Sequence, residues 1–173
     1  PPGYKENAGI FCHNNPWIVI AEAMLGNGDK SYDYFTRITP SFLQDRQDLR
    51  KSEPYVYSQM VAGKDAATPG QAKNSWLTGT AAWCYYAASH YILGIQPDYD
   101  GLSFSPCLPK SWPEVKIHRE YRGAKYDITI NNPNGLSTGV FTLTVDGEVQ
   151  NGNTIDFERF KSSHKVELTL KRG

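Results

Sequence analysis

The residues between positions 4 and 17 have the side chains needed to bind a small polar ligand. Lys5, Glu6, His13 and Asn14 provide a cation, a carboxylate, an imidazole and an amide ahead of an apolar helical pattern. An imidazole can donate a hydrogen bond to an oxyanion and share its proton near neutral pH, while lysine and amide groups suit sugar hydroxyls. Polar groups beside a core are unfavourable unless paired, so this segment predicts a ligand site or a closed hydrogen-bond network.

Each of these residues also has an ordinary structural interpretation. His13 could be a hydrogen-bonded histidine at a helix start, and Lys5 could be a solvated loop charge. Glu6 could orient Lys5, bind a hydroxyl group or simply lie exposed. The residue types alone leave both interpretations open.

A second polar run, residues 74–80, precedes another apolar helical pattern. The N–H groups at a helix start and the helix dipole both favour an anion, and Gly79 would let an oxyanion approach the backbone. Thr78 adds a hydroxyl donor. The alternative is N-capping by Asn74 or Ser75 with Gly79 as a packing notch, and local sequence alone favours that alternative.

The elements that must position these groups are helical before Pro97. Apolar spacing, caps and breakers predict helices over about 16–25, 29–38, 53–62 and 75–93, with a polar connection over 41–52 and a loop over 64–73. Asp29 is a candidate cap of the second helix. The fourth helix is apolar nearly all round, which predicts burial on most sides.

After Pro97 the apolar period falls to two. Six short strands are predicted, around 102–104, 115–117, 126–130, 140–145, 155–157 and 166–170. Their spacing is typical of a small antiparallel β-sandwich. The chain is therefore predicted to be α+β, with a helical domain over residues 1–97 and a β-sandwich domain over 98–173.

Composition narrows the class of protein. The chain has 173 residues, with 18 basic and 18 acidic side chains, which argues against a nucleic-acid binder or an electrostatic membrane reader. No apolar run approaches a membrane span. Cys12, Cys84 and Cys107 form no CxxC pair and predict free buried thiols in a reducing, cytoplasmic compartment. Cys12 beside His13 could instead be a nucleophile, although a packing role is favoured.

Several motifs together resemble a known family. Residues 4–17 are similar to the Y-K-E-N-G-G-[IV]-F-C-H-N-N-P-W signature of cellobiose phosphorylases, the inverting sugar phosphorylases of glycoside hydrolase family ninety-four. The segments 53–57, 73–83 and 92–102 carry further motifs of the same family in the same order. The resemblance implies the last helices of an (α/α)6 barrel followed by a C-terminal, jelly-roll-like antiparallel β-sandwich. The chain departs from the signature at Ala8, where the family usually has a second glycine.

The resemblance also implies roles for individual residues. His13, Thr78 and Gly79 fall where these phosphorylases hold inorganic phosphate. Lys5 and Asn14 match positions that flank the acceptor sugar, with Glu6 between them. The family's general acid is an aspartate in an earlier part of the barrel, so no catalytic residue is expected in this chain.

The implied reaction is reversible phosphorolysis of a β-1,4-glucosyl disaccharide such as cellobiose to α-glucose 1-phosphate and glucose. It needs no metal or organic cofactor, since inorganic phosphate is itself a substrate, and the histidines show no metal-ligand spacing. The expected partners are the sugar, phosphate, the preceding part of the enzyme (possibly as another chain) and, at full length, a second copy in a homodimer. Nucleic acid and membrane are not expected.

Two other classes of protein remain open. The β half could be a non-catalytic carbohydrate-binding module, but its strand aromatics Tyr126, Phe141 and Phe157 alternate as core residues do. Alternatively, the chain could be a structural piece that only caps a barrel. The tryptophans Trp17, Trp76 and Trp83 could stack on sugars, although their helical spacing favours a core position.

Overall fold

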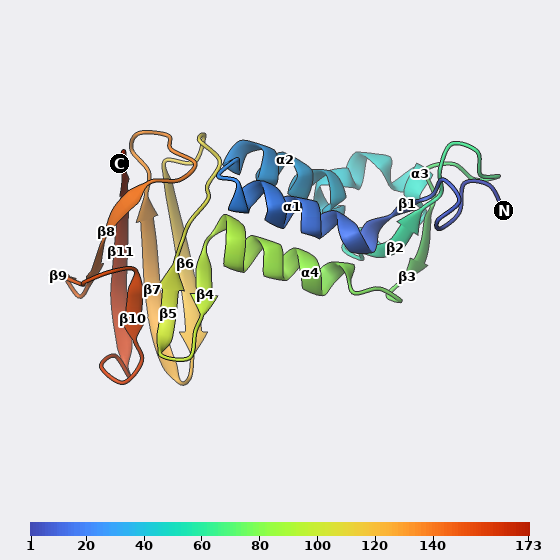
Figure 1. The fold of residues 1–173 in the computed structure, drawn as a ribbon. Helices are drawn as coiled ribbons and strands as arrows, with labels where there is room; N and C mark the ends of the chain where they lie inside the picture. Colours follow the sequence, from blue (N-terminus) through green and yellow to red (C-terminus); the bar gives the residue numbers. More distant parts are fainter. The chain divides into compact units, whose positions relative to one another are not determined.

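The computed structural model describes residues 1–173 and has a mixed α and β architecture (Figure 1). The chain divides into two compact units. We call residues 1–22 and 30–88 the first unit, and residues 23–29 and 89–173 the second unit. No helix is both long enough and apolar enough to cross a bilayer.

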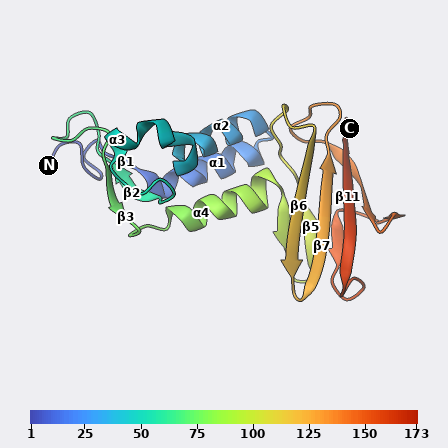
Figure 2. The ribbon, with the colours of Figure 1, turned by 180° about the vertical axis from the view of Figure 1, so that it is seen from behind.

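Helices α1 (Asn15–Met24), α2 (Gly28–Ile38) and α4 (Thr80–Tyr86) supply most of the helical part of the first unit (Figures 1 and 2). The buried hydroxyl of Ser31 on α2 donates to the carbonyl of Val19 on α1 at 2.8 Å. The rings of Trp17 and Trp83 meet edge to face with centroids 5.6 Å apart, which joins α1 to α4. The first contact holds α2 on α1, and the second places the start of α1 against α4.

Three short strands form an antiparallel sheet in the first unit, in the order β1 (Ile10–Phe11), β2 (Ser58–Val61) and β3 (Ala72–Ser75). The helix predicted over 53–62 is therefore wrong throughout, because residues 53–57 form a turn and Ser58–Val61 is β2. Ser58 and Met60 are buried while their neighbours are half-buried, which is a strand pattern. Pairing with β1 and β3 satisfies the backbone groups of β2, and this tertiary pairing outweighs the local helical spacing. β3 likewise begins inside the predicted loop.

The fourth helix begins later than the sequence predicts, at Thr80 instead of Ser75. Asn74 and Trp76 have φ values of 54° and 72°, in the left-handed region, so this stretch cannot be α-helical. Capping by Asn74 or Ser75 is therefore also wrong. Beyond α4 the helix continues as a π-helix, Ala87–Ile92.

The prediction that this helix is buried on most sides is also wrong. Cys84 is buried at 2% exposure, but Tyr85 on the adjacent face is 63% exposed. The helix therefore carries more apolar side chains than packing within the first unit covers.

The predicted polar connection after α2 contains a 3₁₀ helix (Pro40–Arg46) and a short α3 (Gln47–Arg50). α2 ends at Ile38, as the following Thr-Pro pair predicts. Lys51, with φ 52°, ends α3 in the left-handed conformation. Asp29 lies in the first turn of α2, where its Oδ1 accepts the backbone N–H of Lys110 at 2.8 Å instead of capping the helix.

The second unit contains two β-sheets. The first has the order β10-β5-β4, and the second has the order β6-β7-β11-β8-β9. Their bounds are β4 Ile95–Pro97, β5 Gly101–Phe104, β6 Glu114–Tyr121, β7 Ala124–Asn131, β8 Val140–Val145, β9 Glu148–Val149, β10 Thr154–Asp156 and β11 Ser163–Lys171. All the predicted strands are present, and β4 and β9 are additional.

The prediction of wholly antiparallel pairing is wrong at one place. β11 is antiparallel to β8 but parallel to β7, with Ser163 opposite Lys125 and Thr169 opposite Asn131. After β9 the chain visits the other sheet as β10 and then returns as β11. Such a crossover is long enough to let two neighbouring strands run in the same direction.

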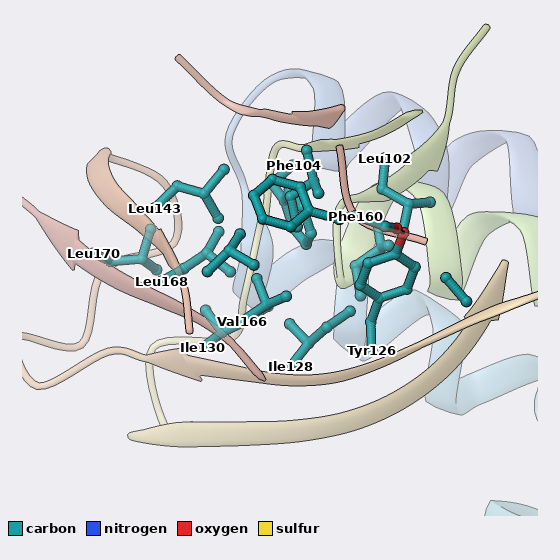
Figure 3. Close-up of a cluster of buried hydrophobic side chains, with 14 of the residues drawn as sticks. Leu102, Phe104, Tyr126, Ile128, Ile130, Leu143, Phe160, Val166, Leu168 and Leu170 are labelled. Carbon is teal, nitrogen blue, oxygen red and sulfur yellow. Dashed lines mark hydrogen bonds between the residues drawn. The ribbon is translucent and has the colours of Figure 1, made fainter. Parts of the chain in front are cut away.

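One hydrophobic cluster joins these two sheets (Figure 3). Leu102, Phe104 and Ile155 come from the smaller sheet, while Tyr126 and Leu168 come from the larger one, and all are at most 1% exposed. Buried and exposed residues alternate along β7, as the period of two predicts. The Tyr126 hydroxyl donates to the carbonyl of Phe160 at 2.9 Å, so its polar atom is satisfied.

A polar junction fixes the turn after β8. Asp146 Oδ2 lies 2.7 Å from His164 Nδ1 on β11, and Asp146 Oδ1 accepts the backbone N–H of Lys165 at 2.9 Å. The hydrogen bond with His164, and then that with Lys165, lower the pKa of the Asp146 carboxyl. Asp146 therefore favours its charged form in the folded chain.

This junction predicts a pH-dependent contribution of Asp146 to stability. A lowered folded pKa gives stability that is present above the unfolded pKa, near 3.8, and is lost as pH falls through the folded value. Asp146→Asn should lower the free energy of unfolding at neutral pH, and its difference from the wild type should shrink in acid. Denaturant unfolding from about pH 2 to pH 7 measures this. Glu120→Gln, at an exposed ion pair with Lys125, is the control and should show little difference at neutral pH. A constant gap between Asp146→Asn and wild type would contradict the prediction.

Candidate functional site

His13 lies in a one-turn 3₁₀ helix, Cys12–Asn14, between β1 and α1. Its ring is half-buried and meets the ring of Trp17 edge to face, with centroids 6.0 Å apart. Phe11 lies on another side, with centroids 6.2 Å apart. Aromatic neighbours therefore fix the position of the imidazole while part of it stays accessible.

Gly79, which immediately precedes α4, lies against this imidazole. A Cβ atom added at Gly79 would be 2.7 Å from His13 Cε1 and 3.3 Å from Nδ1. Gly79 has φ −82°, which any residue can adopt, so the site requires glycine for space and not for conformation. The fold thereby brings together two segments that are far apart in the sequence.

Thr78 and Thr80 organise the start of α4. The backbone N–H of Thr80 donates to Thr78 Oγ1 at 3.1 Å, and the two hydroxyl oxygens are 2.6 Å apart. Thr78 thus satisfies one N–H of the first turn. When the Thr80 hydroxyl donates to Thr78 Oγ1, that oxygen accepts two hydrogen bonds, one from the Thr80 hydroxyl and one from the Thr80 backbone N–H. The hydroxyl proton of Thr78 then remains available to an anion.

Strand β2 supports this helix start. Thr80 is fully buried, and its Oγ1 lies 3.5 Å from the carbonyl oxygen of Ser58. The local sequence pattern did not indicate this support, because the segment that contains Ser58 is spaced as a helix.

Lys5 and Glu6 lie in a separate turn and are exposed. The backbone N–H of Lys5 points to Met60 Sδ at 3.0 Å, and its carbonyl accepts the N–H of Gly9 at 3.1 Å. Both residues line an open cavity of about 700 Å³ with Tyr4, Asn7 and Met60. Neither residue is hydrogen-bonded to His13 or to the start of α4.

Asn14 is the predicted sugar-contact residue that the fold places beside His13. It belongs to the same 3₁₀ turn, and its side chain is exposed. The structure therefore groups the predicted residues in two places: His13, Asn14, Thr78 and Gly79 around the helix starts, and Lys5 with Glu6 in the N-terminal turn.

Trp76 is an exposed aromatic residue, so its predicted core position is wrong. It is 67% exposed, its Nε1 donates to Glu53 Oε1 at 3.2 Å, and its ring meets Tyr55 edge to face. Trp17 is also 47% exposed. By contrast, Tyr126 and Phe141 pack on the core of the second unit, as predicted. The prediction is wrong for Phe157, which is outside that core and lines an open cavity with Tyr99, itself 86% exposed.

Cys12 has the environment of a structural thiol. It is 8% exposed, its Sγ lies 3.9 Å from Ser58 Oγ, and burial raises its pKa. Burial also raises the pKa of Cys84 to about 12 and that of Cys107 to about 11. All three cysteines are free and buried, as predicted, and their raised pKa values disfavour a thiolate nucleophile at neutral pH.

Comparison with known proteins agrees with this arrangement of segments. Residues 1–94 match the catalytic domain of the Glycosyl hydrolase 94 superfamily, and residues 95–149 match the C-terminal domain of Glycosyl hydrolase family 65. The first match covers more than half of the chain. The chain belongs to the Glycosyl hydrolase 94 superfamily, and its matches run from a catalytic domain into a C-terminal domain.

Several of the similar curated proteins are phosphorylases, and another is a cyclic beta-(1,2)-glucan synthase from Rhizobium meliloti that is 31% identical over 76% of this chain. An N,N'-diacetylchitobiose phosphorylase from Vibrio furnissii is 44% identical over 97% of this chain and 21% of its own length. A solabiose phosphorylase from Paenibacillus borealis is 32% identical over 98% of this chain and 22% of its own length. A 3-O-beta-D-glucopyranosyl-beta-D-glucuronide phosphorylase from the same organism is 30% identical over 98% of this chain and 22% of its own length. The chain thus spans about a fifth of the length of these phosphorylases.

The departure at Ala8 predicts a stabilising substitution. Ala8 has φ 65°, a left-handed conformation that costs a non-glycine residue about 1–2 kcal/mol. Glycine avoids that cost but loses more conformational entropy on folding, which costs about 0.5–1 kcal/mol. Ala8→Gly should therefore raise the free energy of unfolding by about 0.5–1 kcal/mol, measured by denaturant titration. Ala81→Gly, at an exposed position of α4, is the matched control and should lower it by a similar amount. A destabilised Ala8→Gly would contradict this conformation.

The contact between His13 and Gly79 predicts a local response to one added methyl group. Gly79→Ala should leave the chain folded but displace the His13 ring, since the new Cβ cannot lie 2.7 Å from Cε1. The NMR signals of the His13 imidazole should move while those of His118, an exposed residue of β6, stay unchanged. Unmoved His13 signals would show that the two residues do not touch.

Proposed function

We propose that the protein containing this chain catalyses inverting phosphorolysis of a β-linked disaccharide, and that this chain supplies its phosphate half-site. The observation that supports the proposal most strongly is the contact of His13 with Gly79 next to the Thr78 hydroxyl. A histidine, a backbone N–H free of side-chain obstruction and a hydroxyl are together suited to an oxyanion. Membership of a family that contains several disaccharide phosphorylases supports the same function.

In the proposed reaction a phosphate oxygen attacks the anomeric carbon from the face opposite the leaving group. The new bond is carbon to phosphate oxygen, and the broken bond is the glycosidic bond to the acceptor oxygen. A general acid outside these 173 residues protonates that oxygen, and the products are an α-sugar 1-phosphate and a free sugar. Phosphate is itself the nucleophile, so the proposed reaction uses one carboxylic acid and no metal or organic cofactor.

Each candidate residue has a defined role in this proposal. His13 donates to a phosphate oxygen, Thr78 donates its hydroxyl proton, and the Gly79 backbone completes the contact. Asn14, Lys5 and Glu6 contact hydroxyl groups of the acceptor sugar. The exposure of these three side chains is consistent with that role.

The proposal also extends to the identity of the disaccharide substrate. The motif resemblance favours cellobiose, whereas the 44% identity to an N,N'-diacetylchitobiose phosphorylase, against 32% for a solabiose phosphorylase, favours N,N'-diacetylchitobiose. We propose N,N'-diacetylchitobiose as the first substrate to test and cellobiose as the second.

The direct experiment uses a full-length protein that contains this chain, incubated with phosphate and each disaccharide. ³¹P and ¹H NMR should show a sugar 1-phosphate whose initial anomer is α. The 173-residue chain alone should be inactive, since a positioned acid contributes roughly 10²–10⁴-fold in rate. Release of two free sugars without a phosphate ester, or of a β-anomer, would overturn the proposed reaction.

Substitution of His13 tests its role in phosphate use. In the full-length enzyme, His13→Ala removes a charge-assisted hydrogen bond worth about 1.5–3 kcal/mol, so kcat/KM for phosphate should fall about 10-fold to 150-fold. His118→Ala, at an exposed histidine of β6, is the control and should retain activity. A lower melting temperature with unchanged kinetics for His13→Ala would make His13 a structural residue only.

A further inference from the structure

A cavity of about 290 Å³ lies within the first unit, apart from the residues assigned above. We call it the Arg50 cavity. Its walls come from the end of α2, the 3₁₀ helix and α3 on one side, and from β1 and β2 on the other. The residues that matter for its chemistry are Arg37, Leu43, Arg46, Arg50 and Tyr57.

Arg50 has no partner in this cavity. Its side chain belongs to a residue that is only 7% exposed, and its Nε is fully buried without a hydrogen bond. The other two cavity arginines lie near carboxylates, Arg37 at 2.9 Å from Asp33 and Arg46 at 4.0 Å from Asp45. Arg50 is therefore the cavity arginine without a carboxylate beside it, and a largely buried guanidinium with an unbonded Nε–H is unfavourable unless an anion is supplied.

The residues on either side of Arg50 also have unsatisfied polar atoms. Both side-chain amide atoms of Gln47 and the hydroxyl of Ser52 are buried without hydrogen bonds. Gln47 opens α3 and Arg50 closes it, while Ser52 follows the left-handed Lys51. Gln47 and Ser52 do not themselves line the Arg50 cavity. Buried polar groups are nearly always paired, so these atoms show that the segment around α3 lacks polar partners at more than one residue.

We propose that the Arg50 cavity is a binding site for a single carboxylate, with the Arg50 guanidinium as its anchor. The planar guanidinium matches a carboxylate in a bidentate pair, and one negative charge neutralises the one uncompensated cation. The remaining lining is mostly apolar, including Ile10, Ile38 and Leu43, which fits a carboxylate on a short apolar stem better than a dianionic phosphate.

The carboxylate bound in this cavity has two possible sources. One is a free short-chain organic acid. The other is a carboxylate side chain from a part of the protein outside these residues, since the chain spans about a fifth of the length of its phosphorylase relatives. The inference is independent of the proposed phosphorolysis, because none of the residues assigned to phosphate or sugar lines this cavity.

Thermal unfolding of the 173-residue chain tests the site, with butyrate as the probe. Butyrate should raise the melting temperature saturably, by several degrees at about 100 times its dissociation constant, at fixed ionic strength. Butyramide has nearly the same shape without the charge and should have no such effect. An equal effect of the two compounds, or no effect of butyrate, would overturn the proposal.

Substitutions then assign the effect to Arg50. Arg50→Met should abolish the butyrate shift, and Arg172→Met, at an exposed arginine near the end of the chain, should retain it. If Arg50→Met does not fold, Arg50→Lys keeps the charge without the planar fork and should weaken butyrate binding about tenfold or more. A shift that survives in the Arg50 variants would overturn the proposal.

The same butyrate experiment on a longer form of the protein, which contains residues before position 1 of this chain, identifies the source of the carboxylate. A butyrate shift that persists there supports a free organic acid as the occupant. Loss of the shift there, with its presence in the 173-residue chain, supports a carboxylate side chain of the protein itself.

Discussion

The contact between the His13 imidazole and the bare Cα of Gly79 is the constraint on which the candidate site depends. A side chain of any size at position 79 would occupy the space of the ring, since even a Cβ would lie 2.7 Å from Cε1. Because the ring can come this close, the turn before α1 meets the turn before α4. The Gly79 backbone at the start of α4 then lies beside a histidine, a combination of groups that can bind an oxyanion.

The rest of the first unit supports that contact. Trp17 packs on both His13 and Trp83, so one aromatic ring braces α1 and α4 together. Thr80 Oγ1 lies 3.5 Å from the carbonyl oxygen of Ser58, so β2 packs against the helix start. Residues in unfavourable backbone conformations, Asn74 and Trp76, come immediately before this turn, as is common near functional sites.

The sequence predicted those parts of the structure that depend on local spacing. The alternation of buried and exposed residues in β7 gave its position directly, and the Thr-Pro pair gave the end of α2. Features that depend on distant partners were missed. Val56 and Met60 are spaced as in a helix, yet pairing with β1 and β3 makes Ser58–Val61 a strand, and the parallel pairing of β11 with β7 has no local signal at all.

The candidate residues His13, Thr78 and Gly79 came from the family resemblance, but their proximity comes only from the fold. Arg50 was overlooked because polar composition predicted a surface connection where the structure buries a guanidinium.

The most direct test is a crystal structure of a full-length protein containing this chain, with inorganic phosphate bound. We expect one phosphate whose oxygens lie within about 2.7–3.2 Å of the His13 imidazole, the Thr78 hydroxyl and the Gly79 backbone nitrogen. A phosphate bound elsewhere, with His13 and Gly79 in contact but beyond reach of the anion, would contradict the account and make their contact a matter of packing alone.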